Sequence, residues 1–84
     1  MKLYIATIIK HYEFGIEPTT FVSGTSTGAM VQVCDYLDDE GAPYDSTDIL
    51  IECENGNQHN EPLSIGVDTD LCHEYLLTTK VIEI

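Results

Sequence analysis

A run of β-branched and aromatic residues opens the chain, and a similar run closes it. The first covers residues 2–10 and the second residues 75–84. Such runs favour β-strands, in which successive side chains point to opposite faces of a sheet. The chain has 84 residues, the size of one small domain. We therefore expect a single domain over residues 1–84 with a strand at each end.

Further strands are predicted between these runs. Residues 19–22 follow a turn around residues 13–15, and Pro18 stands at the start of this strand, where its missing N–H is tolerated. The first two strands are predicted to form a hairpin. A short strand is also predicted over residues 63–67, after a polar segment.

A helix is predicted after the hairpin. Residues 24–27 provide N-caps, and Gly41 followed by Pro43 ends the helix. Its apolar side chains follow the i, i+3, i+4, i+7 rule and are expected to pack on the sheet: Met30, Val33, Cys34 and Leu37. The opposite face is expected to carry Gln32, Asp35, Asp39 and Tyr36.

Residues 46–54 fit two structures. Ser46 is a suitable cap for a short helix, but Ile49, Ile51 and Cys53 alternate with polar or outward positions as in a strand. The Asn55-Gly56 dipeptide is the preferred turn of a two-residue hairpin, which favours the strand. The predicted fold class is thus α+β, with a small antiparallel sheet of three to five strands and one main helix on one face.

The charge balance excludes several functions. The chain has 3 Lys or Arg against 15 Asp or Glu, a net charge of −12, and the 69 residues from His11 to Thr79 contain no Lys or Arg. Direct binding of nucleic acid requires cations, so we exclude it, and anionic membrane surfaces are disfavoured for the same reason. The apolar run over residues 3–9 is far shorter than a membrane span, and the N-terminus lacks the pattern of a signal peptide.

The cysteines indicate a reducing compartment. Cys34, Cys53 and Cys72 are odd in number and widely spaced, which does not fit the disulfide framework of a small secreted domain. We expect reduced thiols and a cytoplasmic location.

The segment Gly24-Thr25-Ser26-Thr27-Gly28 is a G-x-S-x-G sequence between a predicted strand and a predicted helix. This is the context of a nucleophile elbow, in which Ser26 would attack and the backbone N–H of Thr27 would stabilise an oxyanion. The five residues resemble the elbow of patatin-like acyl hydrolases, but an Asp-Gly pair and a second glycine-rich run are missing. We therefore interpret the segment as a capping turn and keep a Ser26-dependent hydrolase as a remote alternative.

No cofactor or metal is predicted. The glycine-containing loop lacks the lysine of a phosphate-binding loop. The acidic and thiol or imidazole side chains near residues 68–74, together with Cys53 and His59, match no standard spacing for zinc or calcium.

The densest acidic segment runs from Asp35 to Glu54, where eight of 20 residues are acidic. DNA carries about one negative charge per 1.7 Å of helix axis. Clustered carboxylates can therefore produce a similar electrostatic field at a basic groove of a partner protein. Tyrosines among the carboxylates add contact area. A solubilising role for these charges is the plainer alternative. The predicted partner-binding residues are Asp35, Tyr36, Asp38, Asp39, Glu40, Tyr44, Asp45, Asp48, Glu52 and Glu54.

The opening residues 1–8, followed by a strand and a helix, resemble the N-terminal half of small phage-encoded proteins. In size, acidity and α+β plan the chain is similar to anti-CRISPR proteins of phages and mobile elements. The resemblance implies a non-enzymatic, DNA-mimicking inhibitor whose partner is a basic nucleic-acid-binding protein or a CRISPR–Cas effector subunit. The alternative is a small acidic adaptor or oligomerisation domain, such as a homodimer, that pairs through an exposed sheet face or edge.

Overall fold

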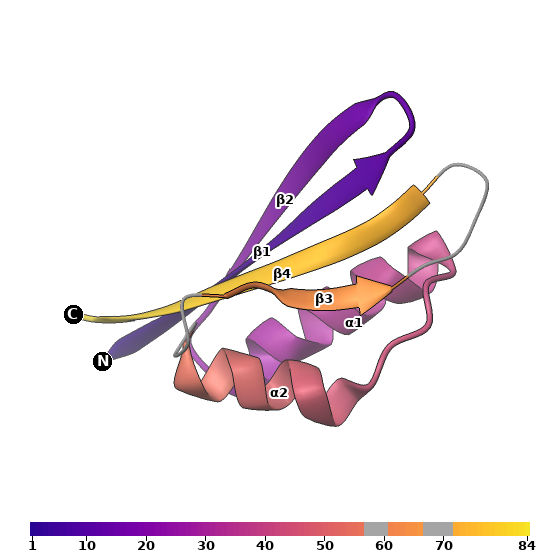
Figure 1. Ribbon diagram of the computed structural model, residues 1–84. Helices are drawn as coiled ribbons and strands as arrows, with labels where there is room; N and C mark the ends of the chain where they lie inside the picture. Colours follow the sequence, from indigo (N-terminus) through magenta and orange to yellow (C-terminus); the bar gives the residue numbers. More distant parts are fainter. Residues whose placement is uncertain (57–60, 67–71) are drawn as a thin grey trace.

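The protein consists of a four-stranded antiparallel sheet and two helices. Its computed structural model describes residues 1–56, 61–66 and 72–84. Figure 1 shows both helices on the same face of the sheet. The elements in chain order are β1 (Lys2–Tyr12), β2 (Gly15–Ser23), α1 (Ser26–Glu40), α2 (Ser46–Asn55), β3 (Leu63–Gly66) and β4 (Cys72–Glu83). The predicted α+β class and antiparallel sheet are confirmed.

The two ends of the chain lie side by side in the centre of the sheet. The strand order is β2-β1-β4-β3, so β1 pairs with both β2 and β4 along most of its length. The predicted hairpin of β1 and β2 is confirmed, with Tyr12 opposite Gly15 at its tip. At the other end the amino group of Met1 donates to the carbonyl oxygen of Ile84 at 3.0 Å.

The predicted helix forms where its signals place it. The side chain of Thr25 accepts a hydrogen bond from the backbone N–H of Gly28 and so caps α1. Gly41 ends the helix with a φ of 72°, in the left-handed region that glycine adopts without a steric penalty. Its N–H donates to the carbonyls of Leu37 and Asp38.

The strand predicted over residues 46–54 is wrong, because this segment forms α2, a second helix. Ile49 and Cys53 are buried while Ile51 is 48% exposed, which is the spacing of one helix face and not of a strand. Asp45 caps the helix by accepting from the N–H of Thr47 at 2.9 Å. The predicted Asn55-Gly56 hairpin turn is wrong as well, since Gly56 ends α2 and donates to the carbonyl of Glu52.

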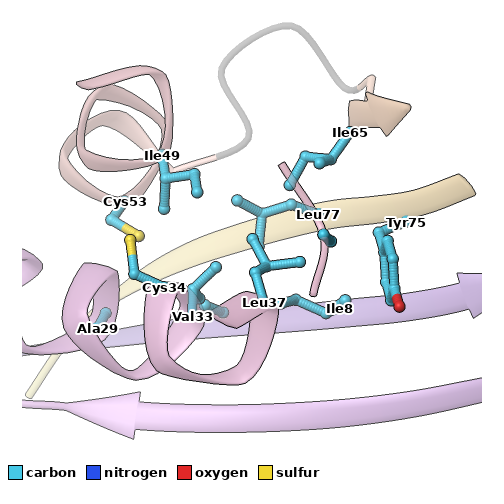
Figure 2. Packing of buried hydrophobic residues seen from close by; sticks show 12 residues of the cluster. Ile8, Ala29, Val33, Cys34, Leu37, Ile49, Cys53, Ile65, Tyr75 and Leu77 are labelled. Carbon is cyan, nitrogen blue, oxygen red and sulfur yellow. The ribbon is translucent and has the colours of Figure 1, made fainter. Parts of the chain in front are cut away.

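One hydrophobic cluster joins the helices to the sheet. Ile8, Tyr75 and Leu77 point from the strands toward side chains of α1 and α2, as Figure 2 shows. Leu37 and Ile49 are the largest buried aliphatic side chains that the helices contribute. The predicted core position of Cys34 is confirmed, since only 8% of this residue is exposed. The core therefore lies between the helix layer and one face of the sheet.

The opposite face of the sheet has no helix on it in the part of the chain that the structure describes (Figure 1). We call it the open face. Because side chains alternate along a strand, the positions next to the buried Ala6, Ile8, Tyr75 and Leu77 point to it. Its larger apolar side chains are Leu3, Ile5, Ile9, Ile16, Val22, Leu76 and Ile82.

Among the described residues, no helix has the length and apolar character required to cross a bilayer.

Candidate protein-binding surface

Carboxylates gather where α1 ends and α2 begins. We call this region, residues 38–48, the α1–α2 corner. It brings together six of the predicted partner-binding residues, which are Asp38, Asp39, Glu40, Tyr44, Asp45 and Asp48. The four aspartates among them are exposed. Residues 41–45 connect the end of α1 to the start of α2, and the two helices pack against each other.

Tyr44 is held at this corner by a carboxylate. Its hydroxyl donates to an Oδ1 atom of Asp38 at 2.8 Å, while the ring packs against the edge of the core. The hydrogen bond to Asp38 is the main reason why the pKa of Tyr44 rises to about 12. The ring is thus fixed in place with one edge toward the acidic surface.

A hollow of about 190 Å³ opens beside Tyr44. Asp45, Asp48 and Pro43 line it from the helix layer, and residues 63–65 of β3 line it from the sheet. The carboxylates of Asp45 and Asp48 also stabilise the positive N-terminal end of α2, Asp45 as the cap and Asp48 in the first turn. The hollow therefore combines negative charge with an aromatic wall.

Glu40 forms an ion pair within the protein. Its Oε2 atom lies 3.1 Å from Nζ of Lys10 on β1, and both side chains are mostly covered. The ion pair links the end of α1 to the central strand. Glu40 thus contributes less net charge to the corner than its neighbours Asp38 and Asp39.

Tyr36 lies away from the corner, contrary to its expected place on the polar face of the helix. Its ring makes edge-to-face contacts with Phe21 at 6.0 Å and with Tyr75 at 6.1 Å between ring centroids. The hydroxyl is buried without a hydrogen-bond partner in the described structure, and burial raises its pKa. Tyr36 is therefore a packing residue, because its ring is covered by the sheet, while Asp35 beside it is exposed.

Glu52 and Glu54 lie at the opposite end of α2 from the corner. At a rise of about 1.5 Å per residue, nine residues of helix separate Glu54 from Asp45 by roughly 14 Å. The eight acidic residues of the predicted site therefore spread along the helix layer, with their highest density at the corner.

The thiols of Cys34 and Cys53 are free and buried. Burial is the largest cause of the raised pKa of both groups, which for Cys53 reaches about 11. A thiol that stays protonated is a poor nucleophile. The side chains of Cys72 and His73, and residues 59, 68 and 70, lie outside the described residues, so the remaining metal candidates are not placed.

The G-x-S-x-G segment forms a capped helix start. Besides the Thr25 cap, the N–H of Thr25 donates to Oγ of Ser23 at 3.2 Å. A Cβ atom on Gly28 would collide with that Oγ atom and would lie 2.9 Å from Oγ1 of Thr25. The second glycine of the motif is therefore required by the hydroxyl groups of the turn, which supports the interpretation as a capping turn.

Sequence reasoning missed two features of this surface. The first is the pair of Lys10 and Glu40, which are 30 positions apart, and the second is the contribution of β3 to the hollow. Both arise from tertiary contacts that leave no local pattern. Comparison with models of protein families, with curated proteins and with solved structures gave no match.

Proposed function

We propose that this chain is a non-enzymatic inhibitor of the kind that phages and mobile elements produce, and that it binds the basic nucleic-acid-binding site of a host defence protein. The partner class is a CRISPR–Cas effector subunit or a similar basic protein in the host cytoplasm. In this proposal the α1–α2 corner is the binding surface and imitates the charge of a nucleic-acid backbone.

The main support for this proposal is the position of the acidic residues at the end of α1. The last turn of α1 contains Asp38, Asp39 and Glu40 and no basic residue, and its first turn contains no acidic residue. The C-terminal end of a helix is negative, so carboxylates there are unfavourable for the helix itself. The helix itself gains no stability from this placement. Asp38 and Glu40 have partners within the protein, Tyr44 and Lys10. Asp39 is exposed and forms no ion pair among the described residues, and binding to a cationic partner accounts for its position.

The hollow beside Tyr44 supports the same function. Two carboxylates and an aromatic ring suit the guanidinium group of arginine, which pairs with carboxylates and stacks on rings. Basic nucleic-acid-binding sites are rich in such side chains. We expect arginine or lysine side chains of the partner to enter the hollow.

Competition with nucleic acid tests the proposal. Purified effector complexes of several CRISPR–Cas types are incubated with labelled target DNA, and bound DNA is measured as the protein is added. We expect the native protein to displace DNA from at least one of them. The variant with Asp39→Lys and Asp48→Lys should be at least about tenfold weaker, because it reverses two charges of the corner.

A matched control changes the charge equally elsewhere. Glu13→Lys with Glu17→Lys alters two exposed residues of the hairpin and β2, and circular dichroism establishes that both variants are folded. Equal inhibition by the two variants would refute the corner as the binding surface. Failure of the native protein against every complex, together with retention of no basic nucleic-acid-binding protein from a host lysate, would refute the function.

A further inference from the structure

The open face of the sheet is apolar in a protein that is otherwise strongly acidic. Ile16 and Val22 on it are 62% and 51% exposed, and Leu3, Ile5, Ile9 and Leu76 lie beside them as partly exposed neighbours. Sheets ordinarily bury such a face against a second layer. The helices provide that layer for the other face only (Figure 1).

The open face also carries little net charge. The register of the strands places one carboxylate on it, Glu74, one ammonium group, Lys80, and the imidazole of His11. The Oε2 atom of Glu74 accepts a hydrogen bond from the hydroxyl of Ser64 at 2.9 Å. Most surfaces of a chain with a net charge of −12 repel a second copy of it, because like charges face each other. This face lacks that repulsion, and two copies that meet there point their acidic helix layers in opposite directions.

The centre of the face permits close packing of two sheets. Thr7 lies opposite Thr20 on β2 and opposite Thr78 on β4, so three small side chains cross the middle of the face. The hydroxyl groups of Thr7 and Thr20 lie 3.1 Å apart and satisfy each other. Small side chains in the middle and larger apolar ones around them suit two sheets stacked about 10 Å apart.

The area is sufficient for a specific dimer. With strands about 4.8 Å apart and about 3.3 Å per residue, three strands of roughly ten residues and the short strand β3 cover about 500 Å² of flat area. Two such faces give about 1,000 Å², which is where specific interfaces begin.

The edges of the sheet are less suited to self-association than the face. Pro18 interrupts the hydrogen-bonding groups of the edge strand β2, and the other edge strand, β3, has only four residues. Prolines and short edge strands both hinder edge-to-edge pairing of sheets.

We propose that the open face binds a second copy of this chain, so that two sheets pack face to face in a symmetric homodimer. The two helix layers then lie on the outside, where each α1–α2 corner is accessible. The inference does not depend on the function proposed for the corner.

Sedimentation equilibrium over about 1 μM to about 1 mM protein tests the dimer. The measurement is made in about 0.5 M salt, where repulsion between charges more than roughly 4–5 Å apart is screened. We expect the native chain to reach twice its monomer mass. The variant with Ile16→Lys and Val22→Lys should raise the dissociation constant at least about tenfold, because it desolvates charge in the interface.

The matched control is Val31→Lys with Ile51→Lys. These residues are 46% and 48% exposed and lie on the helices, so the variant changes the charge equally but should still form the dimer.

Leu76→Lys on the inner strand β4 distinguishes the face from the β2 edge, and we expect it to weaken the dimer as well. A monomer throughout the range, or equal dissociation constants for the face and helix variants, would overturn the proposal. The corner variant Asp39→Lys with Asp48→Lys should still dimerise, so the two proposals can fail separately.

Discussion

At the scale of single residues, the contact between Tyr44 and Asp38 makes a prediction about pH. The hydrogen bond raises the pKa of Tyr44 from 10.0 to about 12, so the folded protein holds this proton more tightly than the unfolded chain. The contribution of the contact to stability is complete below pH 10 and is lost as the pH rises toward 12. The pKa of the buried Tyr36 is raised as well, so the measurement is made in a Tyr36→Phe background. Phenolate absorbance should then show Tyr44 titrating near the upper value.

Two carboxylate variants identify the cause. In Asp38→Asn the late transition should move to lower pH, because the charged acceptor that favours the neutral phenol is gone. Asp35→Asn removes the same charge from a residue that does not contribute to the raised pKa of Tyr44, and it should leave the transition unchanged. A late transition that persists in Asp38→Asn would contradict the assignment.

Residue types at the surface could be predicted from the sequence, but their partners could not. The exposure of Asp38, Asp39 and Asp45 follows from their charge, and the structure agrees. The pairing of Glu40 with Lys10 and the burial of the Tyr36 ring depend on which strand lies beneath α1. No spacing within the helix carries that information, so the exposure of these carboxylates could be predicted, whereas the ion pair of Glu40 and the burial of Tyr36 could not.

At the scale of elements, the strands and α1 could be predicted because their periodicity, caps and turns agree. Residues 46–54 could not, because Ile49 and Cys53 are four apart and are compatible with both a strand and a helix. Ile51 is the residue that separates the two patterns, and its exposure becomes known only in the structure. The helix is also supported from outside the segment, since the hydroxyl of Thr79 on β4 donates to the carbonyl of Glu52 at 2.8 Å.

The Thr79 contact gives a prediction for α2. Thr79 is 5% exposed, and Thr79→Val removes its hydroxyl at nearly constant volume. The carbonyl of Glu52 keeps the N–H of Gly56 as a partner, so we expect a loss of about 0.5–1.5 kcal/mol in the free energy of unfolding. Urea denaturation followed by circular dichroism measures this loss. Thr78→Val, on the open face of the same strand, is the control and should cost nothing; an equal loss in both variants would show that the hydrogen bond is not the cause.

At the scale of the whole molecule, the carboxylates and the exposed apolar side chains of the sheet lie in different layers. The helix layer carries the densest carboxylates, and the open face carries the exposed apolar side chains Ile16 and Val22 of the sheet. Two like charges about 10 Å apart in water repel by about 0.4 kcal/mol, so many such pairs lower the stability of a chain with a net charge of −12. Salt screens these pairs. Rising salt should therefore stabilise the fold and the dimer while it weakens binding of a basic partner at the corner.

Two neighbouring residues separate this general repulsion from specific pairing. Asp39 is exposed, forms no ion pair among the described residues and lies in the negative last turn of α1. Asp39→Asn should therefore raise the free energy of unfolding by about 0.3–1 kcal/mol at low salt. Glu40→Gln removes the same charge but breaks the ion pair with Lys10, and it should give no gain. Urea denaturation of both variants at low and at high salt measures the difference, and the gain of Asp39→Asn should shrink as salt rises because repulsion is screened. If the two variants gained equally, net charge alone would govern stability and the pair with Lys10 would contribute nothing. If neither gained, the carboxylates at the end of α1 would not destabilise the fold. Their position would then no longer support the proposed binding surface.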